Sequence, residues 1–184
     1  SYEIGNAYEP VPQVISKYLE KYPNASTAQE MKELLVDSYI TSKNFEGAMA
    51  LLEKNKGFAS KATYQKVAFY RGVELFMESD YESAAENFQK SLGSAADPVF
   101  TARANYWRGE ALYLLNQFDN ALANYASFKQ NSVAQTTDEY IDVDYNIAYT
   151  YFKLRNYNTA IPNFKKYIES GATDKEKLKR ILGL

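Results

Sequence analysis

A hydrophobic pattern with helical spacing occurs four times along the chain. In each copy an aromatic residue is followed three positions later by alanine and seven positions later by a bulky residue. Residues with this spacing share one face of an α-helix, so each copy predicts an amphipathic helix. The four copies are Phe45-Ala48-Leu52, Tyr81-Ala84-Phe88, Phe118-Ala121-Tyr125 and Tyr157-Ala160-Phe164. Their alanines lie 36, 37 and 39 residues apart, which indicates a structural repeat.

A second helical pattern precedes each of these segments. Twelve residues before each alanine lies a residue that is mostly small: Val36, Gly72, Gly109 and Ala148. A bulky residue follows three positions later: Tyr39, Leu75, Leu112 and Tyr151. Short turns separate the two patterns. We therefore expect helical hairpins in which the small residue lets a neighbouring backbone approach closely. One hairpin cannot bury its apolar face alone, whereas a stack of hairpins can.

Helix start and stop signals support these boundaries. Capping boxes are expected to open three first helices, at Thr27-x-x-Glu30, Thr136-x-x-Glu139 and Thr173-x-x-Glu176. Asp97 followed by Pro98 predicts a further first-helix start. The residues expected to cap second helices are Asn44, Asp80 and Asn156. The ends of second helices are expected near Gly57, Gly93 and Gly171.

Pro162 conflicts with the last of these helices. If Asn156 is the cap, the proline removes one backbone hydrogen bond, to the carbonyl of Asn158, and crowds that carbonyl. We expect either a distorted first turn or a helix that begins nearer Asn158.

The amino-acid composition excludes several classes of function. The chain has 184 residues, 46% of them hydrophobic, and a formal net charge of −2, which gives no electrostatic reason to expect nucleic acid. No apolar run approaches the ~18–20 residues that span a bilayer, so no direct membrane insertion is expected. The absence of cysteine and histidine excludes disulfides, Cys/His zinc sites, thiol nucleophiles and imidazole bases. We expect no catalytic residue, no cofactor and no enzyme activity.

Two charged strings have ordinary interpretations. Residues 142–146, DVDYN, resemble the start of a calcium loop, but Ile147 stands where glycine is needed and Lys153 where glutamate is needed. We therefore expect no metal. The KEKLKR run, residues 175–180, is expected to be a solvated helix face rather than a nucleic-acid patch.

Together, the small residue of each first helix and the aromatic, alanine and bulky residues of each second helix resemble the tetratricopeptide repeat (TPR). Residues 106–125 are the best copy, and the resemblance covers roughly Ser26 to Ser170. It implies an all-α fold, a right-handed superhelical TPR solenoid of antiparallel helix hairpins. A weaker similarity is to bacterial cell-envelope TPR proteins, such as the Tol-Pal-associated periplasmic coordinator and outer-membrane assembly lipoproteins.

The resemblance makes residues 1–184 a single TPR array. Complete repeats are expected at residues 26–57, 60–93, 97–131 and 136–170. Residues 11–22 are expected to form the second helix of a partial repeat, and residues 173–184 the first helix of another. Because isolated solenoids usually need polar capping units, we expect a fragment of a longer protein.

Arginine replaces a leucine of the family at Arg71 and Arg108. An arginine that faces the core would need a carboxylate partner. The alternative is a slightly rotated helix, in which Tyr70 and Trp107 fill the space.

The first helices of TPR arrays line a concave surface, which implies a function here. We expect a non-catalytic protein–protein interaction scaffold that binds a peptide or protein segment in this groove. The expected partner-binding residues are Lys66, Phe69, Phe76, Arg103, Tyr106, Glu110, Tyr113, Asp142, Tyr145, Tyr149 and Phe152. For each aromatic residue the alternative is packing between adjacent first helices, and for Arg103 and Glu110 it is a solvated face.

The alternative function is that of a glycan-binding envelope protein. Such a site needs two or three exposed, roughly coplanar aromatic rings beside Asn or Asp. The expected compartment is the bacterial periplasm or cell envelope, with the cytoplasm as the alternative.

Overall fold

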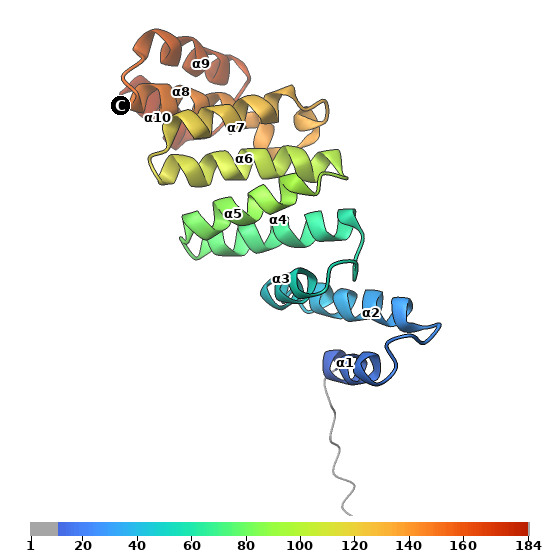
Figure 1. Ribbon diagram of the computed structural model, residues 1–184. Coiled ribbons are helices and arrows are strands. Elements are labelled where there is room, and N and C mark those ends of the chain that lie inside the picture. The colour runs from blue at the N-terminus through green and yellow to red at the C-terminus, as the bar shows by residue number, and fades with distance from the viewer. Residues whose placement is uncertain (1–10, 184) are drawn as a thin grey trace, which may run out of the picture.

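The structure is a computed structural model that describes residues 11–183, and this part of the chain contains helices and no strand (Figure 1). The α-helices are α1 (Val11–Lys21), α2 (Ala28–Thr41), α3 (Phe45–Lys54), α4 (Lys61–Met77), α5 (Tyr81–Gly93), α6 (Pro98–Leu114), α7 (Phe118–Gln130), α8 (Val143–Lys153), α9 (Tyr157–Glu169) and α10 (Lys175–Leu182). The 3₁₀ helices η1 (Ala134–Thr136) and η2 (Asp138–Ile141) precede α8. The predicted all-α, right-handed superhelical solenoid of antiparallel hairpins is confirmed.

The second helix of each hairpin begins where the hydrophobic pattern predicts. These helices start at Phe45, Tyr81, Phe118 and Tyr157. Asn44, Asp80 and Asn156 cap three of them as expected, because each side-chain oxygen accepts a hydrogen bond from the backbone N–H three residues later. Gln117 precedes α7 and makes no such bond with its side chain.

One turn geometry joins the two helices of each hairpin. A residue in each turn has a positive φ, between 56° and 65°: Lys43, Ser79, Asn116 and Arg155. The N–H that follows donates to a carbonyl five residues earlier, at Tyr39, Leu75, Leu112 or Tyr151. These are the bulky residues that repeat in the sequence. The backbone of each repeat therefore closes its first helix in the same way.

The small residues of two first helices make room for a ring of the same hairpin. A Cβ on Gly72 would lie 2.7 Å from the Phe88 ring, and a Cβ on Gly109 would lie 2.7 Å from the Tyr125 ring. Both rings are fully buried. The predicted reason for the small residue is therefore wrong at these positions, because it admits a side chain of the second helix rather than a neighbouring backbone.

The first-helix starts follow the sequence signals less closely. Pro98 begins α6, and the Asp97 side chain accepts bonds from the first free N–H groups, as predicted. Thr27 precedes α2, but its side chain makes no capping bond. Its hydroxyl instead lies 2.8 Å from the hydroxyl of Tyr18 in α1.

The capping box expected at Thr136 is wrong. Thr136 lies in η1, and α8 begins only at Val143. Glu139, the expected partner in the box, is instead the buried acceptor of Arg103 and Trp107. This tertiary contact replaces the local one, and the intervening chain winds into two short 3₁₀ turns.

The remaining signals concern the start of α10 and the ends of the second helices. Asp174 rather than Thr173 caps α10, so the third capping box is also wrong. Gly57 and Gly171 lie just beyond α3 and α9 with φ values of +94° and +80°, as expected for helix ends. Gly93 is the last residue of α5, so the helix end expected there is confirmed.

Pro162 lies inside a continuous helix. α9 runs from Tyr157 to Glu169 with Asn156 as its cap, so the later start near Asn158 is wrong. The proline is exposed to solvent, and the helix tolerates the one backbone bond that it lacks.

The two unusual arginines have different partners. Arg71 has carboxylate partners, with Nη1 3.2 Å from Glu74 and Nη2 3.7 Å from Glu46. Arg108 makes no ion pair within residues 11–183. Its Nη1 donates to Asn124 Oδ1 at 3.2 Å, and its buried Nε has no hydrogen-bond partner there. Burial lowers the pKa of Arg108.

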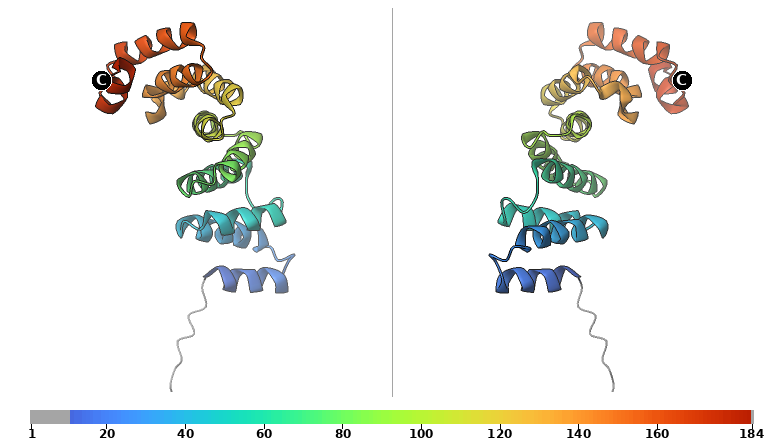
Figure 2. Two further views of the ribbon diagram at one scale, coloured as in Figure 1. Left: turned by 90° about the vertical axis from the view of Figure 1, so that its left-hand side faces the viewer. Right: turned by 90° about the vertical axis from the view of Figure 1, so that its right-hand side faces the viewer.

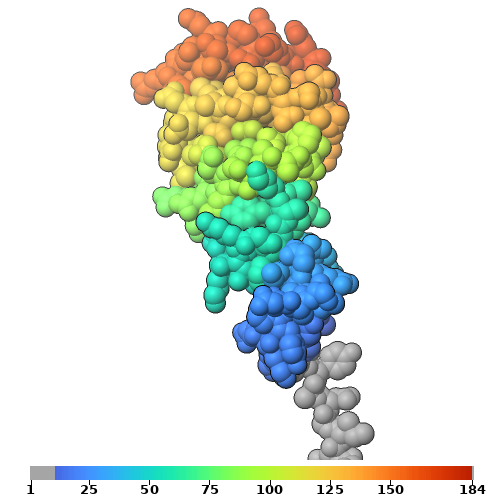
Figure 3. Space-filling model, turned by 45° about the vertical axis from the view of Figure 1, so that its right-hand side comes forward, coloured from blue at the N-terminus to red at the C-terminus, as the bar shows by residue number. Residues whose placement is uncertain are grey.

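The hairpins follow one another along an elongated molecule (Figure 3). Each second helix through α7 packs against the first helix that follows it. α10 makes no comparable packing with α9 within the described chain, and it follows α9 at the C-terminal end of the solenoid (Figure 2). Its Lys177 side chain reaches Asp142 and Tyr145 at the start of α8. This placement brings α10 to the pocket described next.

Candidate binding pocket

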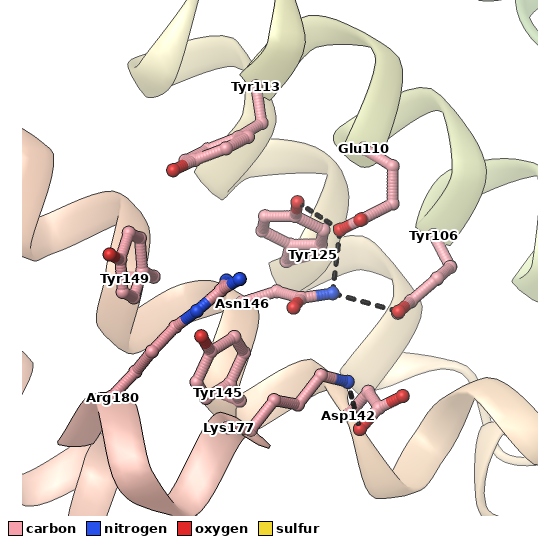
Figure 4. A pocket seen from close by; sticks show the side chains of 10 residues that line it. All are labelled: Tyr106, Glu110, Tyr113, Tyr125, Asp142, Tyr145, Asn146, Tyr149, Lys177 and Arg180. Atoms are coloured by element: carbon pink, nitrogen blue, oxygen red, sulfur yellow. Dashed lines mark hydrogen bonds and ion pairs between the residues drawn. The ribbon is translucent and has the colours of Figure 1, made fainter. Parts of the chain in front are cut away.

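A pocket of about 380 Å³ opens between α6, α8 and α10 (Figure 4). Two first helices provide most of its wall, α7 adds one ring, and α10 adds two basic side chains. The lining residues are Tyr106, Glu110, Tyr113, Tyr125, Asp142, Tyr145, Asn146, Tyr149, Lys177 and Arg180. Tyrosine hydroxyls and charged groups therefore face a common space.

Glu110 is the centre of a hydrogen-bond network on one wall of this pocket. Its Oε1 accepts bonds from Tyr125 Oη at 2.5 Å and from Asn146 Nδ2 at 2.6 Å. Asn146 Nδ2 also donates to Tyr106 Oη at 2.8 Å. This network links α6, α7 and α8 through groups that are partly or fully buried.

Burial raises the pKa of Glu110 to about 7. The hydrogen bond from Tyr125, the charge of Lys177 and the bond from Asn146 act in the opposite direction, while Asp142 adds to the rise. Burial likewise raises the pKa of Tyr113 to about 12. The pocket thus holds a carboxyl group that changes its charge near neutral pH.

The opposite wall carries the positive charges. Lys177 Nζ lies 2.6 Å from Asp142 Oδ1 and 5.2 Å from the centre of the Tyr145 ring. Arg180 points into the pocket between Tyr145 and Tyr149 (Figure 4), and interaction with Tyr145 is the main cause of its raised pKa. The geometry of that contact does not meet a hydrogen bond, so the buried Tyr145 hydroxyl has no partner within residues 11–183.

The expected binding residues fall into two groups. Six line the pocket: Tyr106, Glu110, Tyr113, Asp142, Tyr145 and Tyr149. The others lie outside it. Phe69 is fully buried, so it has no surface for a partner, and Phe76 packs edge-on against Tyr81 and Trp107. Lys66 and Phe152 are exposed and do not line the pocket, although the Phe152 ring packs against Tyr149.

Glu110 does not lie on a solvated face, and neither does Arg103. Arg103 Nε donates to Glu139 Oε1 at 2.7 Å, and its guanidinium lies 4.9 Å from the centre of the Phe69 ring. Trp107 Nε1 donates to the same carboxylate oxygen at 2.9 Å. Burial raises the pKa of Glu139, but the hydrogen bonds from Arg103 and Trp107 outweigh it, and the net shift is downward. Arg103 therefore joins α6 to η2.

Replacing Glu139 with alanine is expected to lower the free energy of unfolding by about 2 kcal/mol, because Arg103 and Trp107 lose their shared acceptor. Urea denaturation measures the change. Glu169→Ala is the matched control, since Glu169 is exposed on α9, and it should change stability by less than about 0.5 kcal/mol. Equal effects of the two substitutions would contradict a structural role for Glu139.

Four pocket residues were missed by the sequence analysis: Tyr125, Asn146, Lys177 and Arg180. Tyr125 belongs to the second-helix pattern, which gave no reason to place its hydroxyl in the groove. Lys177 and Arg180 belong to the charged run that was expected to be a solvated face. Their spacing of three residues, on one helix face, was the available signal.

The calcium-like string serves other purposes. Asp142 pairs with Lys177, and Asp144 Oδ1 lies 2.5 Å from Lys129 Nζ. Within residues 11–183, no group of three or more His, Cys, Asp or Glu side chains is arranged to hold a metal ion. In the same range, no helix combines the length and apolar character needed to cross a bilayer.

The tyrosines do not form the flat exposed platform that glycan binding requires. Tyr106 is 5% exposed and Tyr145 is 6% exposed, so their ring faces are covered. Tyr113 and Tyr149 are only half-buried and present edges and hydroxyls to the pocket (Figure 4). The geometry suits hydrogen bonds and cation–π contacts better than stacking on sugar rings.

Stacked antiparallel helical hairpins with a pocket on the first helices are typical of one class of proteins, the helical-repeat proteins. Two family models described as tetratricopeptide repeat match residues 103–132 and 145–170. These matches identify tetratricopeptide repeats in the C-terminal half of the chain. No curated protein matches the chain.

Solved structures support the same fold. A crystal structure of MamA is 18% identical with a TM-score of 0.56, and the match covers 94% of this chain and 90% of that one. MamA 41-end from Desulfovibrio magneticus RS-1 is 17% identical with a TM-score of 0.53, covering 86% and 84%. The apo form of RapI is 17% identical with a TM-score of 0.61, covering 92% of this chain and 50% of RapI. At these identities the likeness concerns the fold.

Proposed function

We propose that this chain is a non-catalytic protein-interaction scaffold that binds a peptide or protein segment in the pocket between α6, α8 and α10. The observation that carries this proposal is a buried polar group of the pocket that has no hydrogen-bond partner. The Tyr145 hydroxyl is buried without a partner in the described chain. Buried polar groups normally have hydrogen-bond partners, so a ligand that supplies them gains affinity.

The rigid helices of the solenoid also favour binding. The pocket residues of α6 are held by the Tyr125 and Asn146 hydrogen bonds, which join three helices. Side chains already fixed in place lose little rotamer freedom when a partner docks. Tyrosine and arginine, which line this pocket, are among the residue types enriched at the energetically dominant positions of protein interfaces.

A peptide library displayed on phage and selected against the whole chain tests this function. We expect the selected peptides to bind the Tyr149→Ala variant at least about tenfold more weakly, because Tyr149 is a half-buried wall of the pocket. Tyr157→Ala is the matched control, since Tyr157 is 49% exposed on α9 outside the pocket. If the peptides bind both variants as tightly as the unaltered chain, the binding surface lies elsewhere and the proposal fails.

The compartment is part of the proposal. The similarity to envelope TPR proteins favours a bacterial periplasm or cell envelope. Cell fractionation with an antibody against the chain tests this, and recovery in the cytoplasmic fraction would contradict it.

A further inference from the structure

α10 is held to the rest of the molecule in an unusual way. None of its residues is buried, and it does not pack along α9 as the other first helices pack on the second helices before them. Its contact with the pocket depends on two basic side chains, Lys177 and Arg180. The remaining ion pairs of the helix, Lys177 with Asp174 and Lys179 with Glu176, are local.

The charges of the pocket are divided between its walls. The described lining residues from α6 to α8 include two acids, Glu110 and Asp142, and no base. Both basic lining residues belong to α10. Without α10, the face formed by α6, α7 and α8 would present two carboxyl groups among five tyrosines, an environment that favours a cation.

Lys177 shows how this face receives a cation. Its ammonium group is bound simultaneously by the Asp142 carboxylate and by the face of the Tyr145 ring. Arg180 lies one helical turn further on, beside Tyr145 and Tyr149. Two basic residues spaced by three on one helix therefore fit the pocket together.

We propose that the α6–α8 face of the pocket binds lysine and arginine side chains presented by a basic helix of a partner protein, and that α10 occupies this site in the free chain. The proposal rests on the function proposed above and names the partner's chemistry. Exchange of α10 is feasible because partly exposed ion pairs stabilise a docked helix only weakly. The partner helix would form the same two contacts and add apolar contacts beyond them.

A synthetic peptide of residues 173–184 is the probe for this site, and fluorescence anisotropy is the measurement. In the whole chain carrying Lys177→Glu and Arg180→Glu, acidic side chains replace the two cations of α10, which should leave the acidic face free. We expect this chain to bind the unaltered peptide at least tenfold more tightly than the unaltered chain does. Because no residue of α10 is buried, the fold should persist, and circular dichroism checks that it does.

Two further variants keep the test decisive. Leu178→Ala weakens α10 docking without adding charge, since Leu178 is a half-buried residue of α10, and it should also increase peptide binding. The chain that carries Lys177→Glu and Arg180→Glu is called the opened chain. Adding Glu110→Gln and Asp142→Asn to it should abolish the gain in peptide affinity. A peptide with Lys177→Glu and Arg180→Glu should not bind the opened chain.

The pH dependence of peptide affinity shows whether the pocket binds a cation or an anion. Glu110 is faced by Tyr106 on α6, Tyr125 on α7, Asn146 on α8 and Lys177 on α10, with Asp142 nearby. A bound cation favours the ionised carboxyl group, so peptide affinity should rise from pH 6 to pH 8. Affinity that falls over this range would indicate an anionic ligand held by Arg180.

The outcomes distinguish the two proposals. If the opened chain does not bind the basic peptide, or if the unaltered chain prefers the acidic one, the cation site is wrong. If library peptides that depend on Tyr149 then prove acidic or neutral, the interaction scaffold stands without it. If no peptide of either kind depends on Tyr149, both proposals fail.

Discussion

Replacing Gly72 with valine is expected to lower the free energy of unfolding by about 3 kcal/mol. A Cβ at this position would lie 2.7 Å from the fully buried ring of Phe88, so the added methyl groups must displace that ring or separate α4 from α5. The ring has no open space to enter, because it also packs against Phe69 in the same core. Chemical denaturation of the purified chain measures the loss.

Two further variants test this explanation. Gly93→Val is the matched control, because a Cβ on Gly93 meets nothing within 4 Å, and it should change stability by less than about 1 kcal/mol. Combining Gly72→Val with Phe88→Leu reproduces the residues of the first hairpin, where Val36 and Leu52 lie in one core cluster. The double variant should recover at least half of the loss. No recovery would mean that the ring contact is not the cause.

The unaltered chain is expected to become less stable as the pH rises from 5 to 8. In the Glu110→Gln variant this loss of stability should be absent. The pKa of Glu110 is raised to about 7 in the folded chain, above its ordinary value of 4.5, mainly by burial. The folded chain therefore holds a proton that the unfolded chain releases, and stability falls as pH rises from about 4.5 to about 7. A shift of this size corresponds to a loss on the order of 3 kcal/mol. Glutamine stays neutral, so its stability should not follow this slope.

The absence of histidine makes this measurement clear, since no imidazole titrates in the same range. Urea denaturation at pH 5, 6, 7 and 8 gives the slope for each variant. Glu82→Gln is the control, because Glu82 is exposed on α5, and it should keep the slope of the unaltered chain. Parallel slopes in the unaltered chain and Glu110→Gln would show that Glu110 does not titrate near neutrality.

The second helices could be predicted from the sequence because their signals are local. The aromatic, alanine and bulky positions lie within two turns of helix, and caps such as Asn44 and Asp80 act on the first turn alone. The left-handed residues of the turns, such as Lys43 and Arg155, were not predicted, because lysine and arginine have no preference for positive φ.

Signals that compete with tertiary contacts were less reliable. Glu139 has the spacing of a capping box with Thr136, yet it forms bonds with Arg103 and Trp107 more than thirty residues earlier in the chain. The sequence contains both possibilities. The buried contact forms because it satisfies a guanidinium and an indole N–H together, which a single cap cannot do.

The pocket could be predicted only in part, for a similar reason. The periodicity of first helices places Tyr106, Glu110 and Tyr113 on one face of α6, and this requires only helical geometry. The contribution of α10 depends on where a charged helix turns in space. A run such as KEKLKR is compatible with solvent on every side, so its contact with Asp142 and Tyr145 needs the structure.

In the proposed function, the chain binds its partner through the first helices at the C-terminal end of the solenoid. Backbone amide NMR of the isotope-labelled whole chain, titrated with a peptide selected from the library, tests it most directly. We predict chemical-shift changes concentrated in residues 106–113 and 142–149 and in α10. Changes confined to the second helices α5, α7 and α9 would contradict the account.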